Sequence, residues 1–200
     1  MHYINPMTDL PSLSFQPAKQ DDNAFLFAAY AASRDDEMAM VMWDETAKNA
    51  FLQTQFAAQQ RHYLAHYDNV SCHIVKLREQ SVGLIWVARW PKEIRLMDMV
   101  VLTQYRNQGI GTYLLQQLMA EAAQTNRMVT LHTWEGNPAA ARFYIKHGFA
   151  KVSSDGMYAQ MEWRAQPSDT VLTQSITLPT QPNANTTTTH TLHATHTAHR

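Results

Sequence analysis

The chain has 200 residues, of which 45% are hydrophobic and 16% are charged, and its formal net charge is −1. This size fits one domain, or one domain with a tail. The near-neutral charge argues against a broad nucleic-acid surface and against a polybasic membrane patch. The single cysteine, Cys72, excludes a disulfide framework and a cysteine-based zinc site within one chain, and it fits a reducing compartment. Cys72 lies in an apolar alternating stretch, so we expect it to be buried.

The N-terminus lacks the basic region and apolar core that are typical of a signal peptide. The longest clean apolar run, Val82–Ala88, is far shorter than the roughly 20 residues of a membrane-spanning helix. We therefore expect a cytoplasmic protein without a membrane partner.

The composition changes near Arg164. From Ala165 to Arg200 there is no aromatic residue, while threonine and proline recur. Such a segment cannot bury enough apolar surface to offset its ordering entropy, so we predict a folded domain at residues 1–164 and a disordered Thr/Pro/His-rich tail at residues 165–200. Four tail histidines follow a three-residue step, namely His190, His193, His196 and His199. They suit either a metal-binding tract or a solvated tail of biased composition, and we expect no preorganised metal site.

Apolar periodicity and capping residues predict mixed secondary structure in the folded part. Its first half reads as a strand, two helices and three strands: Leu13–Gln16, Asp21–Ser33, a helix capped by Asp44 that reaches about Ala65, Ser71–Leu77, Val82–Trp90 and Ile94–Leu102. Its second half reads as a helix, a strand, a helix and two strands: Gly109–Ala123, Met128–Trp134, Pro138–Lys146, Phe149–Val152 and Met157–Trp163. This order predicts an α/β fold in which hairpins precede a strand–helix–strand crossover.

The most informative stretch is VVLTQYRNQGIGT, residues 100–112, in which an apolar strand is followed by a polar loop and an amphipathic helix. Gly109 and Gly111 allow a ligand to approach the backbone closely. Free N–H groups and the positive end of the helix dipole suit a phosphate or a diphosphate, to which Arg106 can add a charge-assisted contact.

Two common phosphate-binding motifs do not fit this stretch. A P-loop needs a lysine after its second glycine, and neither glycine here is followed by one. A Rossmann fingerprint needs a third glycine or alanine where this chain has Leu114. The remaining pattern, Arg-x-x-Gly-x-Gly, leaves open on its own a glycine loop that binds nothing.

A second segment, NPAAARFYIKHGF at residues 137–149, follows the next predicted strand. Together the two segments resemble the GCN5-related N-acetyltransferase (GNAT) family. The central motif of that family is a strand, Q/R-x-x-G-x-G/A and a helix; its next motif is a strand, an asparagine, an aromatic-tyrosine pair and Gly-Phe. Both motifs occur here in order, with 26 residues from Gly111 to Asn137. The resemblance covers Leu13–Trp163 as element order and Asp98–Phe149 as motif.

The resemblance implies an α/β GNAT fold: a mixed central sheet of about seven strands, about four helices on both faces, and splayed strands at the cofactor site. It implies acetyl-CoA as the acyl-donor co-substrate, bound between the strand that ends at Leu102 and the strand Met128–Trp134. The implied cofactor contacts are pantetheine beside Met99 and Val101, the diphosphate on Arg106, Asn107, Gln108, Gly109, Ile110, Gly111 and Thr112, and the cofactor arm on Asn137 and Tyr144. For Asn137 a helix cap before Pro138 is an equal alternative.

The resemblance also implies transfer of acetyl to a primary amine by direct attack in a ternary complex. Tyr144 matches the family tyrosine that approaches the cofactor sulfur and can protonate the leaving thiolate. A backbone N–H near Met99 can stabilise the oxyanion. The reaction needs no metal.

The general base is where the chain departs from the family. Arg95 occupies the position where members often place glutamate or tyrosine, and arginine does not act as a base at ordinary pH. His132 and Asp98 are the main catalytic candidates, with Glu93 and Glu135 as others. His132 resembles the strand histidine that some N-terminal acetyltransferases use through a water, and its pKa suits the role. Both His132 and Asp98 also have purely structural explanations.

The implied acceptor is an amine of a small molecule, a peptide or a protein, and we expect its pocket to form from the first two helices and the final hairpin. Polar candidates there are Gln55, Gln59, Gln60, Arg61, His62 and Tyr63. Two other hypotheses remain open: a catalytically silent acyl-CoA-binding module, motivated by Arg95, and an interaction protein whose glycine loop is empty. A homodimer is common in the family.

Overall fold

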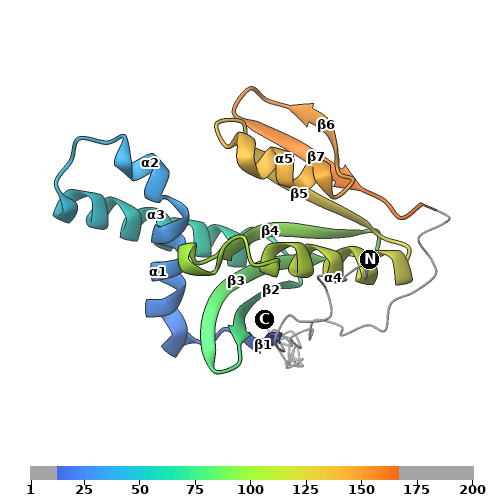
Figure 1. The fold of residues 1–200 in the computed structure, drawn as a ribbon, viewed down its shortest axis with the longest axis horizontal. Coiled ribbons are helices and arrows are strands. Elements are labelled where there is room, and N and C mark those ends of the chain that lie inside the picture. The colour runs from blue at the N-terminus through green and yellow to red at the C-terminus, as the bar shows by residue number, and fades with distance from the viewer. Residues whose placement is uncertain (1–12, 167–200) are drawn as a thin grey trace, which may run out of the picture.

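The computed structural model describes residues 13–166 as one mixed sheet with helices on both faces (Figure 1). The seven strands lie in the order β1-β2-β3-β4-β5-β7-β6. Their bounds are β1 Leu13–Pro17, β2 Val70–Leu77, β3 Gln80–Arg89, β4 Glu93–Val101, β5 Met128–Trp134, β6 Ala150–Ser154 and β7 Tyr158–Trp163. The neighbouring strands β4 and β5 are parallel, and the other neighbours are antiparallel.

Five α-helices cover this sheet within residues 13–166: α1 Asn23–Ser33, α2 Asp35–Ala39, α3 Glu45–His66, α4 Ile110–Gln124 and α5 Pro138–Lys146. Two short 3₁₀ helices, Gln20–Asp22 and Thr103–Tyr105, lie before α1 and after β4. The predicted cap of α3 is confirmed, because the Asp44 carboxylate accepts a hydrogen bond of 2.8 Å from the Ala47 N–H.

The sheet separates two apolar cores because side chains alternate along each strand. In β3, Leu84 and Trp86 face α1 and α3, whereas Ile85 and Val87 face α4. The aromatic side chains of α5 pack on the same side as α4. Cys72 is buried in the α1–α3 core, as predicted, and burial raises the pKa of its thiol to about 12, so it is a structural residue.

Helix α2 is an element that the sequence analysis missed. It begins with Asp35, Asp36 and Glu37, and three acids in a first turn interact favourably with the N-terminal end of a helix. The Arg34 guanidinium, just before the helix, donates to Glu37 Oε1 at 2.8 Å. Local charge therefore supports a helix that is too short to show an apolar period.

The strands β4 and β5 separate, as expected, at the middle of β4. They pair only from Glu93 and Met128 to Leu96 and Leu131, although both strands continue beyond that point. A bulge lies at the same level, because Trp86 of β3 faces Asp98 while the next residue, Val87, faces Leu96. The extra residue turns the rest of β4 away from β5.

Two predictions concern residues outside the described range, namely the character of the N-terminus before residue 13 and the tail. The predicted tail lies outside that range from residue 167 on, together with its four spaced histidines. Within residues 13–166, no helix has both the length and the apolar character needed to cross a membrane.

Candidate active site

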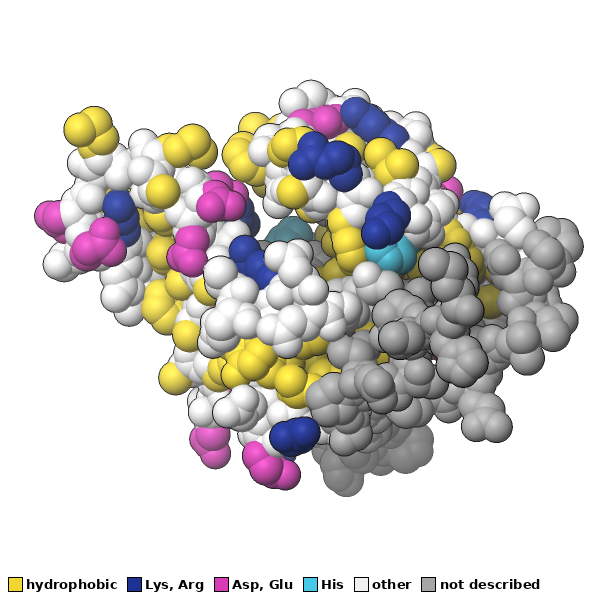
Figure 2. Space-filling view, in the orientation of Figure 1, with side chains coloured by type: hydrophobic (Ala, Val, Ile, Leu, Met, Phe, Trp, Pro, Cys, Tyr) yellow, Lys and Arg dark blue, Asp and Glu magenta, His cyan; other side chains and the backbone are white. Residues whose placement is uncertain are grey.

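Two cavities meet where β4 and β5 separate. Figure 2 shows a hollow in the surface between the lobe at the left and the lobe at the upper right. One of the two cavities, of ≈ 610 Å³, extends toward the start of α4, and we call it the cofactor cleft. The other, of ≈ 670 Å³, extends between α1, α3 and the β6–β7 turn, and we call it the acceptor cavity. Six residues line both: Ser33, Met99, Val100, Asn137, Ala140 and Tyr144. A ligand in the cleft can thus present one end to a second ligand in the cavity.

The open edge of β4 offers unpaired backbone groups to the cleft. The Leu102 N–H donates to Val82 of β3 at 2.9 Å, so by strand alternation the backbone groups of Met99 and Val101 point to the opposite side, toward β5. No β5 residue pairs with them. Buried backbone groups require partners, and an extended ligand arm can supply them.

The loop before α4 forms a cradle of free N–H groups. Gly109 is the N-cap, with φ of 84° and no side-chain cap, and Asn107 also has a positive φ, of 60°. The first turn of α4, from Ile110 to Thr112, leaves N–H groups without partners inside the helix. Such a turn binds anions through its N–H groups and the helix dipole.

Arg106 and Gln108 lie differently from the other residues predicted to bind the cofactor. The Arg106 guanidinium donates to the backbone carbonyls of Val101, at 3.0 Å, and Ala32, at 3.3 Å. It therefore holds the loop against β4 and α1. The Gln108 side chain donates to the Gln104 carbonyl and does not line the cleft. The remaining predicted cofactor residues all line it: Met99, Val101, Asn107, Gly109, Ile110, Gly111, Thr112, Asn137 and Tyr144.

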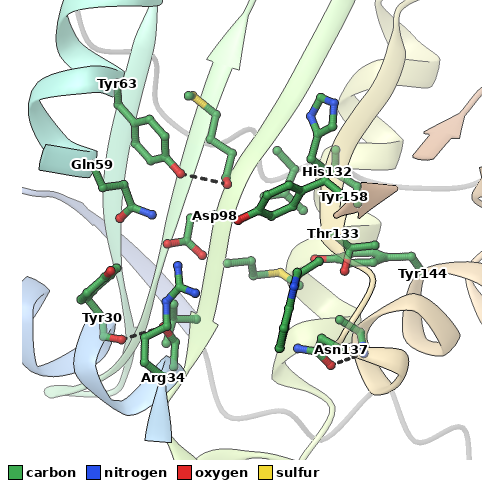
Figure 3. A pocket seen from close by; sticks show the side chains of 18 of the residues that line it. Tyr30, Arg34, Gln59, Tyr63, Asp98, His132, Thr133, Asn137, Tyr144 and Tyr158 are labelled. Carbon is green, nitrogen blue, oxygen red and sulfur yellow. Dashed lines mark hydrogen bonds between the residues drawn. The ribbon is translucent and has the colours of Figure 1, made fainter. Parts of the chain in front are cut away.

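Asn137 and Tyr144 reach the junction from the two ends of α5 (Figure 3). The Asn137 side chain accepts from the Ala140 N–H at 3.0 Å, so the expected helix cap is present in a residue that also lines both cavities. The Tyr144 hydroxyl has no hydrogen-bond partner within residues 13–166. Burial, and secondarily the charge of Asp98, raise the pKa of Tyr144, so this hydroxyl keeps its proton at neutral pH.

Asp98 lies in the acceptor cavity, on the side of Tyr30 and Tyr63 (Figure 3). Burial raises the pKa of its carboxyl to about 6, against the opposing effects of the Arg34 charge and the Met99 N–H. The Arg34 guanidinium also lies 5.4 Å from the centroid of the Tyr30 ring. A carboxyl group and a guanidinium group thus face the same cavity, the first from β4 and the second from the junction of α1 and α2.

His132 lines the acceptor cavity from β5, across from Asp98 (Figure 3). Burial lowers the pKa of its imidazole, and the charge of Arg95 lowers it further, while Asp155 and Glu93 oppose both. At neutral pH the imidazole is therefore neutral and able to accept a proton. The imidazole of His132 makes no hydrogen bond to any of the described residues.

Arg95 does not reach the junction. It lies in the part of β4 that still pairs with β5, opposite Thr130. Its Nε donates to Glu93 Oε1 at 3.0 Å and to Thr130 Oγ1 at 3.3 Å, and its guanidinium lies 5.5 Å from the Trp90 ring centroid. The Glu93 carboxylate, another base candidate, is thereby engaged by Arg95. The fourth base candidate, Glu135, pairs with Lys151 and does not line the acceptor cavity.

The acceptor cavity has the walls that the sequence analysis expected, but only some of the expected side chains. Gln59, His62 and Tyr63 of α3 line it, whereas Gln55, Gln60 and Arg61 do not. The residues that the sequence analysis missed there include Tyr30, Arg34, Tyr67 and Tyr158. Helical spacing from Tyr63 to Tyr67 was the available signal for one of them. Within residues 13–166, no three His, Cys, Asp or Glu side chains gather in a way that could hold a metal ion.

Comparison with known proteins agrees with this geometry. The sequence profile described as "Acetyltransferase (GNAT) family" matches residues 37–149, which is more than half of the chain. The chain therefore belongs to the GNAT acetyltransferase family, as the two motifs indicated.

Individual relatives are more distant. The Drosophila melanogaster protein described as probable N-acetyltransferase san is 31% identical over 96 residues, which cover 47% of this chain and 50% of that protein. The chain thus matches about half the length of this curated relative.

Solved structures share the fold. The PaiA N-acetyltransferase of Thermoplasma acidophilum, in complex with coenzyme A, has a TM-score of 0.61 at 16% identity, over 77% of this chain and 99% of that chain. Arabidopsis thaliana Naa50, in complex with the bisubstrate analogue CoA-Ac-MVNAL, has a TM-score of 0.54 at 17% identity, over 77% and 99%. The predicted GNAT fold is confirmed.

Proposed function

We propose that the chain is an acyl-CoA-dependent N-acetyltransferase that transfers acetyl from acetyl-CoA to a primary amine. The observation that carries this proposal is the junction of the two cavities, where a free N–H cradle, an open strand edge and an unpartnered tyrosine hydroxyl converge. Family membership and the coenzyme A in the PaiA structure support acetyl-CoA as the donor. Holding both substrates at one junction lowers the entropic barrier to attack.

In this proposal the diphosphate of acetyl-CoA binds the N–H groups at residues 109–112. The pantetheine arm follows the open edge of β4 at Met99 and Val101, and the thioester lies beside Tyr144. The lone pair of the amine attacks the thioester carbonyl carbon, and backbone N–H groups of the open edge stabilise the oxyanion. This attack forms the C–N bond and a tetrahedral intermediate, and collapse of the intermediate re-forms the carbonyl and breaks the C–S bond.

Two proton transfers complete the reaction. His132 accepts the proton that the amine nitrogen loses, through a water. Tyr144 donates a proton to the departing thiolate, and its raised pKa means that the hydroxyl still carries this proton when the thiolate forms. Asp98 attracts the incoming ammonium group into the cavity, since it is mostly ionised at neutral pH. The ammonium group loses one proton to solvent before attack, which frees the lone pair, and the proton that His132 accepts is the second one. Arg95 acts on His132 only through its positive charge and transfers no proton.

Peptide amines belong in the acceptor panel beside small amines. Naa50 was solved with an analogue that joins coenzyme A to the peptide MVNAL, and san is named as an N-acetyltransferase. A thiol-release assay with acetyl-CoA and this panel tests the proposal. Acetylation of at least one amine is the expected result, and cofactor binding with no turnover on any amine favours the silent acyl-CoA-binding module.

The roles of His132 and Asp98 separate in a pH series. For a base, kcat falls as pH decreases through the pKa of that base in the enzyme–substrate complex, and for His132 this acid limb lies below the ordinary value of about 6.5. We expect His132→Gln to lower kcat by about 100-fold and to remove this limb. Asp98→Asn should raise KM for the amine and leave the limb in place.

The opposite outcome of these two substitutions would exchange the roles of His132 and Asp98. If Asp98→Asn abolishes the limb and His132→Gln retains it, Asp98 is the base. His62→Gln is a matched control for the histidine change, because His62 lines the same cavity from α3 and its ring packs on His66, 4.5 Å away. Loss of the acid limb in that variant would contradict a specific role for His132.

A further inference from the structure

The cofactor cleft contains a cation that the structure leaves unengaged. Among the described residues, its lysine and arginine side chains are Lys146 and Arg106. Arg106 is committed to the Val101 and Ala32 carbonyls. The Lys146 side chain is exposed and makes no ion pair or hydrogen bond within residues 13–166. A ligand with several phosphate charges therefore meets one free ammonium group in this cleft.

Lys146 lies one helical turn beyond the level of the N–H cradle. A Cβ added to Gly111 would lie 3.6 Å from Phe143 Cζ, so the Phe143 ring packs against the first turn of α4. Phe143 and Lys146 line the cleft from one face of α5, since residues three apart are neighbours on a helix. Their Cα atoms are separated by about 4.5 Å along the helix axis. A lysine stem spans such a distance to a phosphate next to the diphosphate.

His147, the neighbouring residue, already uses one of its ring nitrogens within α5. Its Nδ1 lies 2.8 Å from the Phe143 carbonyl oxygen and is the protonated nitrogen of that pair. In the tautomer that makes this bond, the other ring nitrogen is an acceptor and offers no proton to an anion. Lys146 is consequently the residue on which anion binding at this end of the cleft depends.

Acetyl-CoA carries a diphosphate and, on the ribose of its adenosine, a separate 3′-phosphate. The N–H groups at the start of α4 account for the diphosphate but leave the 3′-phosphate without a partner. We propose that Lys146 binds this 3′-phosphate and so distinguishes CoA from its 3′-dephospho form. This inference rests on the proposed function, because it needs CoA to occupy the cleft.

Isothermal titration calorimetry of the full chain with CoA and with 3′-dephospho-CoA tests the proposal. Wild type should bind CoA about 10-fold more tightly, as expected for one charge-assisted contact at a partly exposed site. Lys146→Met should bring the ratio of the two affinities close to one by weakening CoA alone. Lys146→Arg should retain most of the preference, which separates lost charge from lost folding.

Arg142→Met is the matched control, because Arg142 lies on α5 one turn before Lys146 and does not line the cleft. A similar loss of preference in Arg142→Met would indicate a general charge effect and overturn the proposal. Equal affinities in wild type, or equal weakening of both ligands by Lys146→Met, would also overturn it, while leaving the proposed function intact because both ligands bind. If neither ligand binds wild type, the cofactor assignment itself fails.

Discussion

Acetyl-CoA binding is expected to be lost when Gly109 is replaced by valine. Gly109 has φ of 84°, a left-handed conformation that a β-branched side chain adopts only at considerable cost. The residue caps α4, so a change in its backbone turns the N–H groups of residues 109–112 away from the diphosphate. Each lost charge-assisted hydrogen bond weakens binding about tenfold or more, so we expect a loss of at least about 100-fold.

Calorimetry with acetyl-CoA measures this loss, and circular dichroism checks that the variant folds. Gly156→Val is the control, because Gly156 also has a left-handed φ, of 88°, lies in the turn between β6 and β7, and has no atom within 4 Å of an added Cβ. It should bind acetyl-CoA as wild type does. Unchanged affinity in a folded Gly109→Val variant would contradict the cradle.

The second large effect is expected for Tyr144→Phe. The change removes one hydroxyl and keeps the ring, which packs against Phe143 and Phe149 at centroid distances of 5.3 and 5.7 Å. If this hydroxyl protonates the thiolate, kcat should fall by about 100-fold or more. The affinity for acetyl-CoA should change by less than about threefold, because the diphosphate and pantetheine contacts are untouched.

Single-turnover acetyl transfer, with acetyl-CoA bound in advance, measures the chemical step apart from product release. Tyr113→Phe provides the control, since Tyr113 packs on the α4 core and lines neither cavity. A wild-type rate in Tyr144→Phe removes Tyr144 from the chemistry. A loss of affinity that matches the loss of rate would make Tyr144 a binding residue only.

Local sequence patterns were sufficient for the cofactor side of the site. The glycines at the start of α4, the asparagine before Pro138 and the tyrosine of α5 each have a local conformational or spacing signal, and all line the cleft. The separation of β4 from β5 was available only through the resemblance to the GNAT family. The bulge between Leu96 and Asp98 that accompanies it depends on pairing with β3, which no local pattern reports.

The acceptor side depended on contacts between distant segments and was less predictable. Arg34 and Asp98 are 64 positions apart in the sequence, and only the packing of α1 on the sheet brings them to one cavity. The contact of Arg106 with the Ala32 carbonyl was equally hard to predict from local sequence, because the two residues are 74 positions apart. The disordered tail and the homodimer stay predictions, and so does a cytoplasmic location.

The most direct test of the central claim is a crystal structure of the full chain with coenzyme A bound. We predict the diphosphate oxygens on the N–H groups of residues 109–112, the pantetheine arm along Met99 and Val101, and the sulfur near the Tyr144 hydroxyl. A structure in which the cradle is empty, or in which coenzyme A lies away from the junction of the two cavities, would contradict the account.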